Sequence, residues 1–128
     1  MRDVLVVAAG GAIGAVARYK MSGLVLHRTL DWSFPAATFA VNVFGCLVAG
    51  ALSGLVERHD MFGPHTRLLL FTGLLGGFTT FSAFGLETVH LLRRGHAGTA
   101  ALYVALSVLA GLAAFYLAFS LVPHSRAR

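Results

Sequence analysis

Four long apolar segments, separated by short polar connections, constrain the fold of this 128-residue chain more than any other feature. A helix needs about 20 predominantly apolar residues to cross the hydrocarbon core of a bilayer. Segments of this kind occupy approximately residues 4–26, 34–56, 68–92 and 98–122. The sequence therefore predicts an all-α integral membrane protein, in which residues 1–128 form one domain of four transmembrane helices.

The composition excludes most other classes of protein. Only 12% of the residues are charged and 57% are hydrophobic, whereas soluble domains carry about 25% charged residues. The net charge of +5 is distributed in ones and twos through the connections rather than gathered in a patch, so we expect no nucleic-acid partner. The single cysteine, Cys46, allows no internal disulfide and no thiolate metal site.

The sequence also gives no support for catalysis. No helix face carries a pair of acids, there is no nucleophile elbow, and the six histidines are scattered. The start of the chain superficially resembles a signal peptide that ends at Ala15-Val16-Ala17. Asp3 cancels the positive charge expected at the beginning of such a peptide, so we expect a retained first helix. We predict that the protein is not an enzyme.

The basic residues bear on topology. With four spans, five of them fall on the side of the N-terminus, namely Arg2, Arg58, Arg67, Arg126 and Arg128. Five fall on the opposite side, namely Arg18, Lys20, Arg28, Arg93 and Arg94. The positive-inside rule then gives no preferred orientation, even if Arg18 lies inside the membrane. This balance predicts dual topology and an antiparallel homodimer of two opposed copies.

The third apolar segment carries an unusual polar centre. Gly76 and Gly77 are adjacent, and Thr79, Thr80 and Ser82 follow them. Glycine is a poor helix former, and β-branched threonines beside a glycine pair favour a break. Carbonyls released at membrane depth must be buried in protein, hydrated or bound to a cation. The alternative is a continuous, kinked helix whose hydroxyls bond to the preceding turn.

Two further features are candidates for function, a phenylalanine pair that follows this centre and an asparagine in the second apolar segment. Phe81 and Phe84 are three residues apart and share a helix face. Such a pair usually packs in a core, but its positive ring edges could also face a small anion. Asn42, in the second segment, can donate two hydrogen bonds, which suits either an anion or a contact between helices.

Other residues repeat helical spacing. Hydroxyl or amide side chains lie four residues apart in two pairs, Thr38 with Asn42 and Tyr103 with Ser107. Arg18 and Glu87 are ionisable residues within or next to spans, where such groups are costly and often functional. Glycines recur at the spacing of close helix packing, in the pairs Gly10/Gly14, Gly50/Gly54 and Gly73/Gly77.

Taken together, these motifs resemble the fluoride channel family known as Fluc or CrcB. The resemblance covers the whole chain and is carried by residues 10–19, by residues 38–45 around Asn42, by residues 73–84, and by Tyr103 with Ser107. The glycine break followed by two spaced phenylalanines is the most specific part.

The resemblance implies a dual-topology homodimer that exports fluoride passively through two antiparallel pathways and protects the cell from fluoride. The implied pore residues are Asn42, Phe81, Phe84, Ser107, Thr80, Ser82, Thr38 and Tyr103. Arg18 would lie near a vestibule, and the backbone carbonyls of Gly76 and Thr79 from both chains would hold a structural Na⁺ at the dimer interface. The implied location is the bacterial inner membrane, as a multi-pass protein in the lipid bilayer.

The chain departs from the family pattern at three positions. Ala37 stands where glycine is usual, Ala83 replaces a usual Thr or Ser, and Gly111 occupies a position that some members fill with serine. These changes predict a shorter track of hydroxyls.

Two other functions remain open on the sequence. A small multidrug-resistance antiporter has four helices and a similar length, but its mechanism needs a carboxylate in the middle of the first helix, and Val4 to Ala17 contains none. The chain could instead be a purely structural subunit of a membrane complex. Fluoride flux from purified protein separates these functions.

Overall fold

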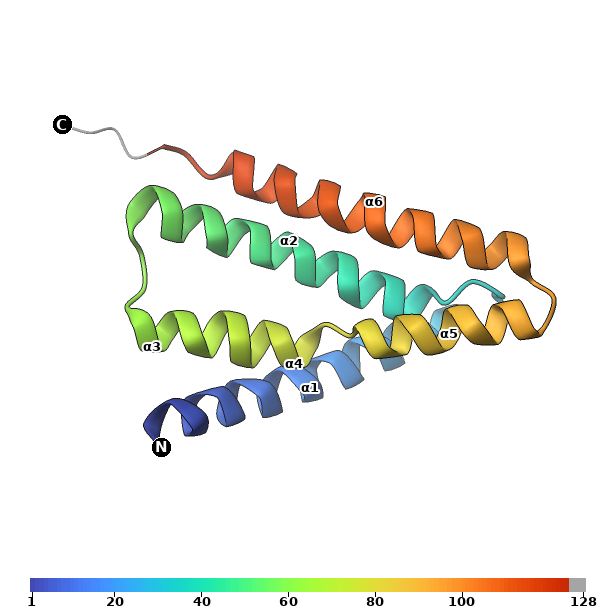
Figure 1. The fold of residues 1–128 in the computed structure, drawn as a ribbon, viewed down its shortest axis with the longest axis horizontal. Helices are drawn as coiled ribbons and strands as arrows, with labels where there is room; N and C mark the ends of the chain where they lie inside the picture. The colour runs from blue at the N-terminus through green and yellow to red at the C-terminus, as the bar shows by residue number, and fades with distance from the viewer. Residues whose placement is uncertain (125–128) are drawn as a thin grey trace.

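The computed structural model describes residues 1–124, and within them four helical segments are long and apolar enough to cross a membrane (Figure 1). They are α1 (Arg2–Arg28), α2 (Ala36–His59), the composite segment Pro64–Arg93, and α6 (Ala97–Leu121). The predicted all-helical class and the number of spans are confirmed. Arg126 and Arg128, which enter the charge count, lie outside the described residues.

The third span is broken in the middle. In chain order it consists of α3 (Pro64–Arg67), the π-helix η1 (Leu68–Leu75), α4 (Gly76–Phe78) and α5 (Phe81–Arg93). Between α4 and α5, Thr79 (φ −81°, ψ 155°) and Thr80 (φ −147°, ψ 110°) have extended backbone conformations. The predicted break is therefore confirmed, and the alternative of a continuous kinked helix is wrong. The π-helical winding before the break was not predicted.

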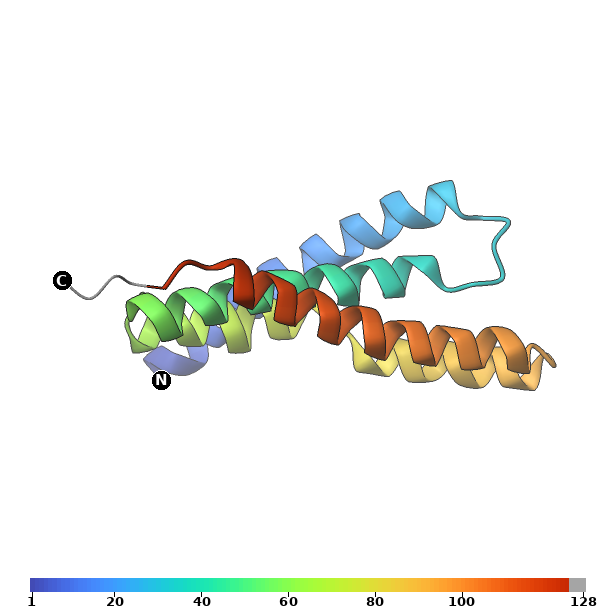
Figure 2. The same ribbon diagram turned by 90° about the horizontal axis from the view of Figure 1, so that it is seen from above.

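Glycines allow α1 to pack closely against the first half of the third span. A Cβ atom on Gly10 would lie 2.7 Å from the carbonyl oxygen of Leu69, and one on Gly14 would lie 2.8 Å from the amide nitrogen of Phe78. Gly50 and Gly54 allow the same close approach of α2 to α6, with which α2 runs side by side (Figures 1 and 2). The predicted packing role of the glycine pairs is confirmed.

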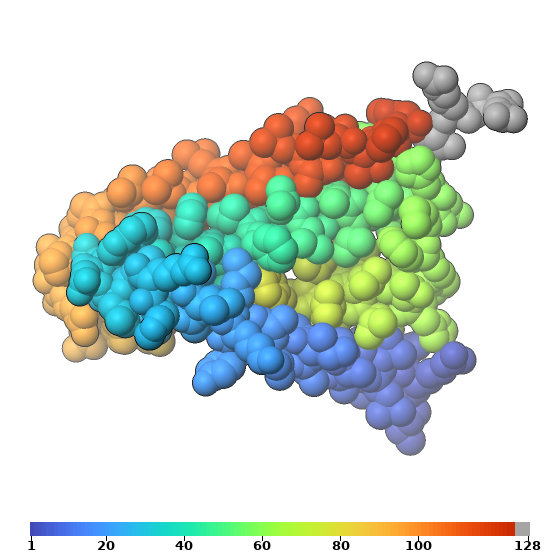
Figure 3. Space-filling model, turned by 180° about the vertical axis from the view of Figure 1, so that it is seen from behind, coloured from blue at the N-terminus to red at the C-terminus, as the bar shows by residue number. Residues whose placement is uncertain are grey.

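The second half of α1 diverges from α5 and α6, as Figure 2 shows from above. The space-filling view of the α1 and α2 face shows atoms of the third span between these two helices (Figure 3). An open groove of about 810 Å³ lies along this half of α1, and its polar lining includes Lys20, His27, Thr38 and Glu87.

The last turn of α2 holds the end of α6. Arg58 donates hydrogen bonds to the carbonyl oxygens of Ser120 and Val122, and its guanidinium lies 4.8 Å from the ring centroid of Phe119. The final carbonyls of a helix have no partners within it, so a cation here satisfies them and interacts favourably with the helix dipole. This contact fixes the fourth span at its C-terminal end.

Candidate functional site at the break of the third span

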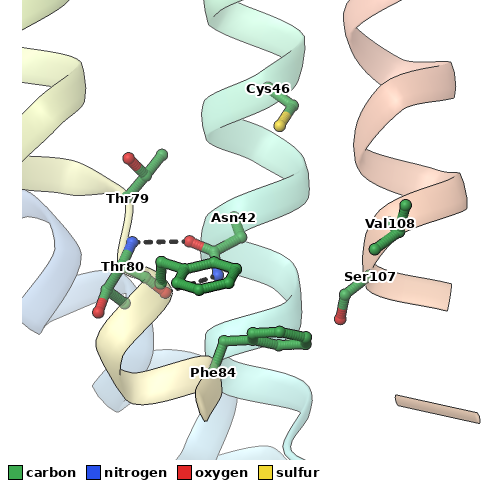
Figure 4. Close-up of a pocket in the computed structure, with 8 residues that line it drawn as sticks. Asn42, Cys46, Thr79, Thr80, Phe84, Ser107 and Val108 are labelled. Atoms are coloured by element: carbon green, nitrogen blue, oxygen red, sulfur yellow. Dashed lines mark hydrogen bonds between the residues drawn. The ribbon is translucent and has the colours of Figure 1, made fainter. Parts of the chain in front are cut away.

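The side chain of Asn42, in the second turn of α2, pairs with the backbone of the break. Its Nδ2 donates to the carbonyl oxygen of Thr80 at 3.0 Å, and its Oδ1 accepts from the amide of Thr80 at 2.8 Å (Figure 4). Two matched hydrogen bonds replace those that a continuous helix would provide to Thr80, so extended backbone is tolerated at membrane depth. Asn42 thus makes the interhelical contact that was one of its two predicted roles.

The break leaves backbone carbonyls without their helical donors, and two of them, those of Gly76 and Thr79, lose these donors to side chains. In a continuous helix the amide of residue i+4 bonds to the carbonyl of residue i. The carbonyl of Gly76 would accept from the amide of Thr80, but this amide donates to Oδ1 of Asn42 instead. The carbonyl of Thr79 would accept from the amide of Ala83, but this amide donates to the Thr80 hydroxyl at 3.2 Å. Side chains have therefore taken both donors, which leaves these carbonyl oxygens available to another partner.

Thr80 also begins α5. Its hydroxyl accepts the amide of Ala83, which is the usual geometry of a helix N-cap, and lies 3.3 Å from the hydroxyl of Ser82. The first turn of α5 carries Phe81 and Phe84, whose ring centroids are 5.3 Å apart with the planes inclined by 40°. The prediction that these rings share one helix face is confirmed.

A cavity of about 300 Å³ opens beside the break. Six of the residues that line it were predicted site residues, namely Asn42, Thr79, Thr80, Phe81, Phe84 and Ser107. Cys46 and Val108 also line it and were not predicted as site residues (Figure 4). The spacing contains a signal for Cys46, because it lies four residues after Asn42 and therefore on the same face of α2.

Two side-chain atoms, one of them at the cavity, are buried without a hydrogen-bond partner in the described part of the chain. They are the hydroxyl oxygen of Ser107 and the Nε atom of Arg18. Buried polar groups normally have hydrogen-bond partners, so these two groups are free to bind water or a ligand. The Ser107 hydroxyl lies at the wall of the cavity on α6, opposite the Asn42 side (Figure 4).

Two further predicted pore residues, Thr38 and Tyr103, lie together around Glu87. The hydroxyl of Thr38 donates to Oε1 of Glu87 at 2.7 Å, and the hydroxyl of Tyr103 donates to Oε2 at 2.7 Å. The cluster joins α2, α5 and α6, and Tyr103 packs on Phe84 with ring centroids 5.1 Å apart. The sequence marked Glu87 as a functional candidate, but no local spacing connects it with its two partners.

The broken third span, the apolar cavity with a few hydroxyl and amide groups, and the four membrane-spanning helices define a multi-pass membrane protein of the transport class. Residues 5–119 match the family described as CrcB-like protein, Camphor Resistance (CrcB). The chain belongs to this family.

Relatives extend the comparison over almost the whole chain. A protein of Methylobacillus flagellatus named fluoride-specific ion channel FluC is 57% identical over 95% of this chain and 95% of its own length. A protein with the same name from Novosphingobium aromaticivorans is 48% identical over 91% of this chain and 92% of its own length. A third, from Flavobacterium psychrophilum, is 41% identical over 89% of this chain and 91% of its own length. The resemblance that the sequence motifs indicated is therefore confirmed.

Proposed function

We propose that this protein is a fluoride-selective ion channel, not an enzyme, and that it exports fluoride passively. Its membership of the CrcB-like family and the name of its relatives support this function. The observation within the molecule that carries it is the cavity at the break, where amide, hydroxyl and aromatic groups meet without a lysine or arginine in the lining.

The chemistry of this lining suits a small, strongly hydrated anion. An ion that leaves water must find replacement donors, yet conduction requires that it can leave again. The second N–H of Asn42, the hydroxyls of Ser107 and Thr80, and the positive edges of the phenylalanine rings each offer a weak interaction. The hydroxyl of Ser82 does not line the cavity but lies 3.3 Å from that of Thr80, so it would extend the route beyond it. A buried cationic side chain would hold the anion far more strongly and would slow its exit.

We further propose that two copies assemble in opposite orientations. Phe81 is 84% exposed in the single chain, although it belongs to the cavity wall. An anion path cannot be bounded by lipid tails, because its polar groups would lose their partners there. A second copy that covers this side would complete the wall, and the equal distribution of basic residues allows both orientations.

The carbonyls of Gly76 and Thr79 fit a structural Na⁺ at the interface of such a dimer. Sodium prefers oxygen ligands, and these are the two carbonyls whose helical donors have been taken by Asn42 and Thr80. A bound cation would supply a fixed positive charge close to the anion path. Among residues 1–124, no group of three His, Cys, Asp or Glu side chains could hold a metal ion, so backbone oxygens are the relevant donors.

The proposed location is the bacterial inner membrane, and the other pore residues keep roles on the same route. Thr38 and Tyr103 would border the route, and each could donate to an anion only after its hydroxyl had left the Glu87 carboxylate to which it now donates. Arg18 would lie toward an aqueous vestibule, next in sequence to Tyr19 and Lys20, which line the groove along α1. Hydrogen fluoride enters a cell as a neutral molecule and dissociates inside. The negative interior then drives the anion outward through the channel without an energy source.

Reconstitution in liposomes tests this function. Purified protein should release fluoride from loaded vesicles when a potassium ionophore clamps the potential, and should release chloride far more slowly. Release of neither anion would remove the channel function and favour a structural subunit. Proton-coupled uptake of an organic cation would instead support the multidrug antiporter.

Labelling in intact cells tests the assembly separately. If both orientations coexist, single cysteines placed near the C-terminus should react with an impermeant reagent in about half of the molecules, with Cys46 replaced by serine. Complete labelling or complete protection would contradict dual topology, while leaving the fluoride function untouched.

A further inference from the structure

The break of the third span rests on one face of α2. Asn42 and Gly45 are three residues apart on that helix, so they share a face. Asn42 pairs with the backbone of Thr80, and Gly45 faces the neighbouring residue, Thr79. The two residues of the break, Thr79 and Thr80, thus contact Gly45 and Asn42, which are neighbours on one face of α2.

The contact at Gly45 depends on the absence of a side chain. A Cβ atom built on Gly45 would overlap the Cγ2 methyl of Thr79, whereas the next nearest atoms, of the Phe78 ring, would be 3.4 and 3.7 Å away. The clash therefore comes from one methyl group. Thr79 cannot easily rotate away, because its hydroxyl donates to the carbonyl oxygen of Leu75 at 2.9 Å.

We propose that Gly45 is a positioning residue for conduction: it seats the Thr79 methyl so that Asn42 can hold Thr80 and fix the backbone of the break. Gly45 has no polar side chain and binds no ion. It acts through the backbone of Thr79 and Thr80, whose position sets where the Thr80 hydroxyl and the remaining N–H group of Asn42 lie in the cavity. The inference rests on the proposed fluoride function and adds a residue to which no role was assigned.

The test is a double-mutant cycle with a change of one methyl on each side. In Gly45→Ala, the new methyl must displace the Thr79 backbone, and we expect fluoride flux to fall by about tenfold or more, since overpacked interiors shift backbone. In Gly45→Ala with Thr79→Ser, the obstructing methyl is gone while the hydroxyl bond to Leu75 is retained. Relative to Thr79→Ser alone, Gly45→Ala should then reduce flux by no more than about twofold.

A matched glycine on α2 controls for general damage to helix packing. A Cβ on Gly54 would lie 2.8 Å from Cγ2 of Val122 and 3.0 Å from the carbonyl oxygen of Phe119, far from the break. Gly45→Ala and Gly54→Ala should each lower the melting temperature in detergent. Adding Thr79→Ser should reduce this loss for Gly45→Ala but not for Gly54→Ala. If Thr79→Ser reduced the loss of melting temperature for both glycine variants, it would act by loosening the bundle in general, and the proposal would be overturned.

The melting temperature of the four proteins in the Gly45–Thr79 cycle gives a second readout of the same contact. The effects on it should also be non-additive, so the cycle can be read even if Thr79→Ser itself lowers flux. Undiminished flux in Gly45→Ala would overturn the proposal. An equal effect of Gly45→Ala in both backgrounds, on flux and on melting temperature, would overturn it as well. Failure of wild-type protein to conduct fluoride would instead refute the proposed function.

Discussion

Removal of the Tyr103 hydroxyl isolates one bond in the polar cluster that ties three helices together. Tyr103 is 0% exposed, and its hydroxyl donates to Oε2 of Glu87 at 2.7 Å. Tyr103→Phe keeps the ring, which packs on Phe34 and Phe84 with centroids 5.4 and 5.1 Å apart. The substitution therefore deletes a hydrogen bond and little apolar contact.

The expected magnitude follows from the acceptor. Hydrogen bonds to charged groups contribute about 1.5–3 kcal/mol, and a buried acceptor left without a donor costs a similar amount. We take about 2 kcal/mol for Tyr103→Phe. At this chain length each kcal/mol shifts a melting temperature by roughly 3–5 °C, so the variant should melt about 6–10 °C lower in detergent.

Circular dichroism during heating in detergent measures this shift, and two further variants make the result specific. Tyr116 is 69% exposed on the same helix, so Tyr116→Phe should change the melting temperature by less than about 2 °C. In a Glu87→Gln background, Tyr103→Phe should cost about half as much, because bonds between neutral groups are roughly half as strong. A cost below about 0.5 kcal/mol in wild type, or an unchanged cost in the Glu87→Gln background, would refute the reasoning.

Three other changes have expected outcomes on the same preparations. Phe81→Ile should suppress fluoride flux in liposomes while the elution volume of the assembly stays unchanged, and full conduction would remove the ring-edge contact from the mechanism. Gly14→Ala should destabilise the fold by about 2 kcal/mol or more because its Cβ would lie 2.8 Å from the Phe78 amide, whereas Gly23→Ala, with open space around it, should be neutral or raise stability by up to about 1 kcal/mol. Equal stability of these two glycine variants would contradict the close packing at Gly14. Arg58→Ala should lower stability by about 1–2 kcal/mol and increase proteolysis near the end of α6, and unchanged cleavage would contradict the contact of Arg58 with this end.

The features that could be predicted from the sequence are those encoded in local patterns. Four spans follow from the apolar runs, and the break follows from Gly76 and Gly77 beside two threonines. The pairing of Phe81 with Phe84 follows from helical spacing. Each of these depends on neighbours within one or two helical turns, where composition and period are sufficient.

The features that could not be predicted depend on contacts between distant segments. Glu87 meets Thr38, 49 residues earlier, and Tyr103, 16 residues later, only because three helices pack in one arrangement. The overlap between Gly45 and the Thr79 methyl has the same origin. The π-helical winding of η1 has no signal in its leucine-rich sequence, which would suit an α-helix equally well.

Asn42 shows how two alternatives from the sequence can both be physically satisfied. A carboxamide has one acceptor oxygen and two N–H donors. The contact with Thr80 uses the oxygen and one N–H group, which leaves one N–H without a role in holding the break. Since Asn42 also lines the cavity, this remaining donor is the one that an anion could approach. An aspartate would keep the bond from the Thr80 amide, but it would lose both donors and add a negative charge. Asn42→Asp should therefore abolish fluoride flux even where the protein folds, and appreciable conduction in that variant would separate Asn42 from the anion path.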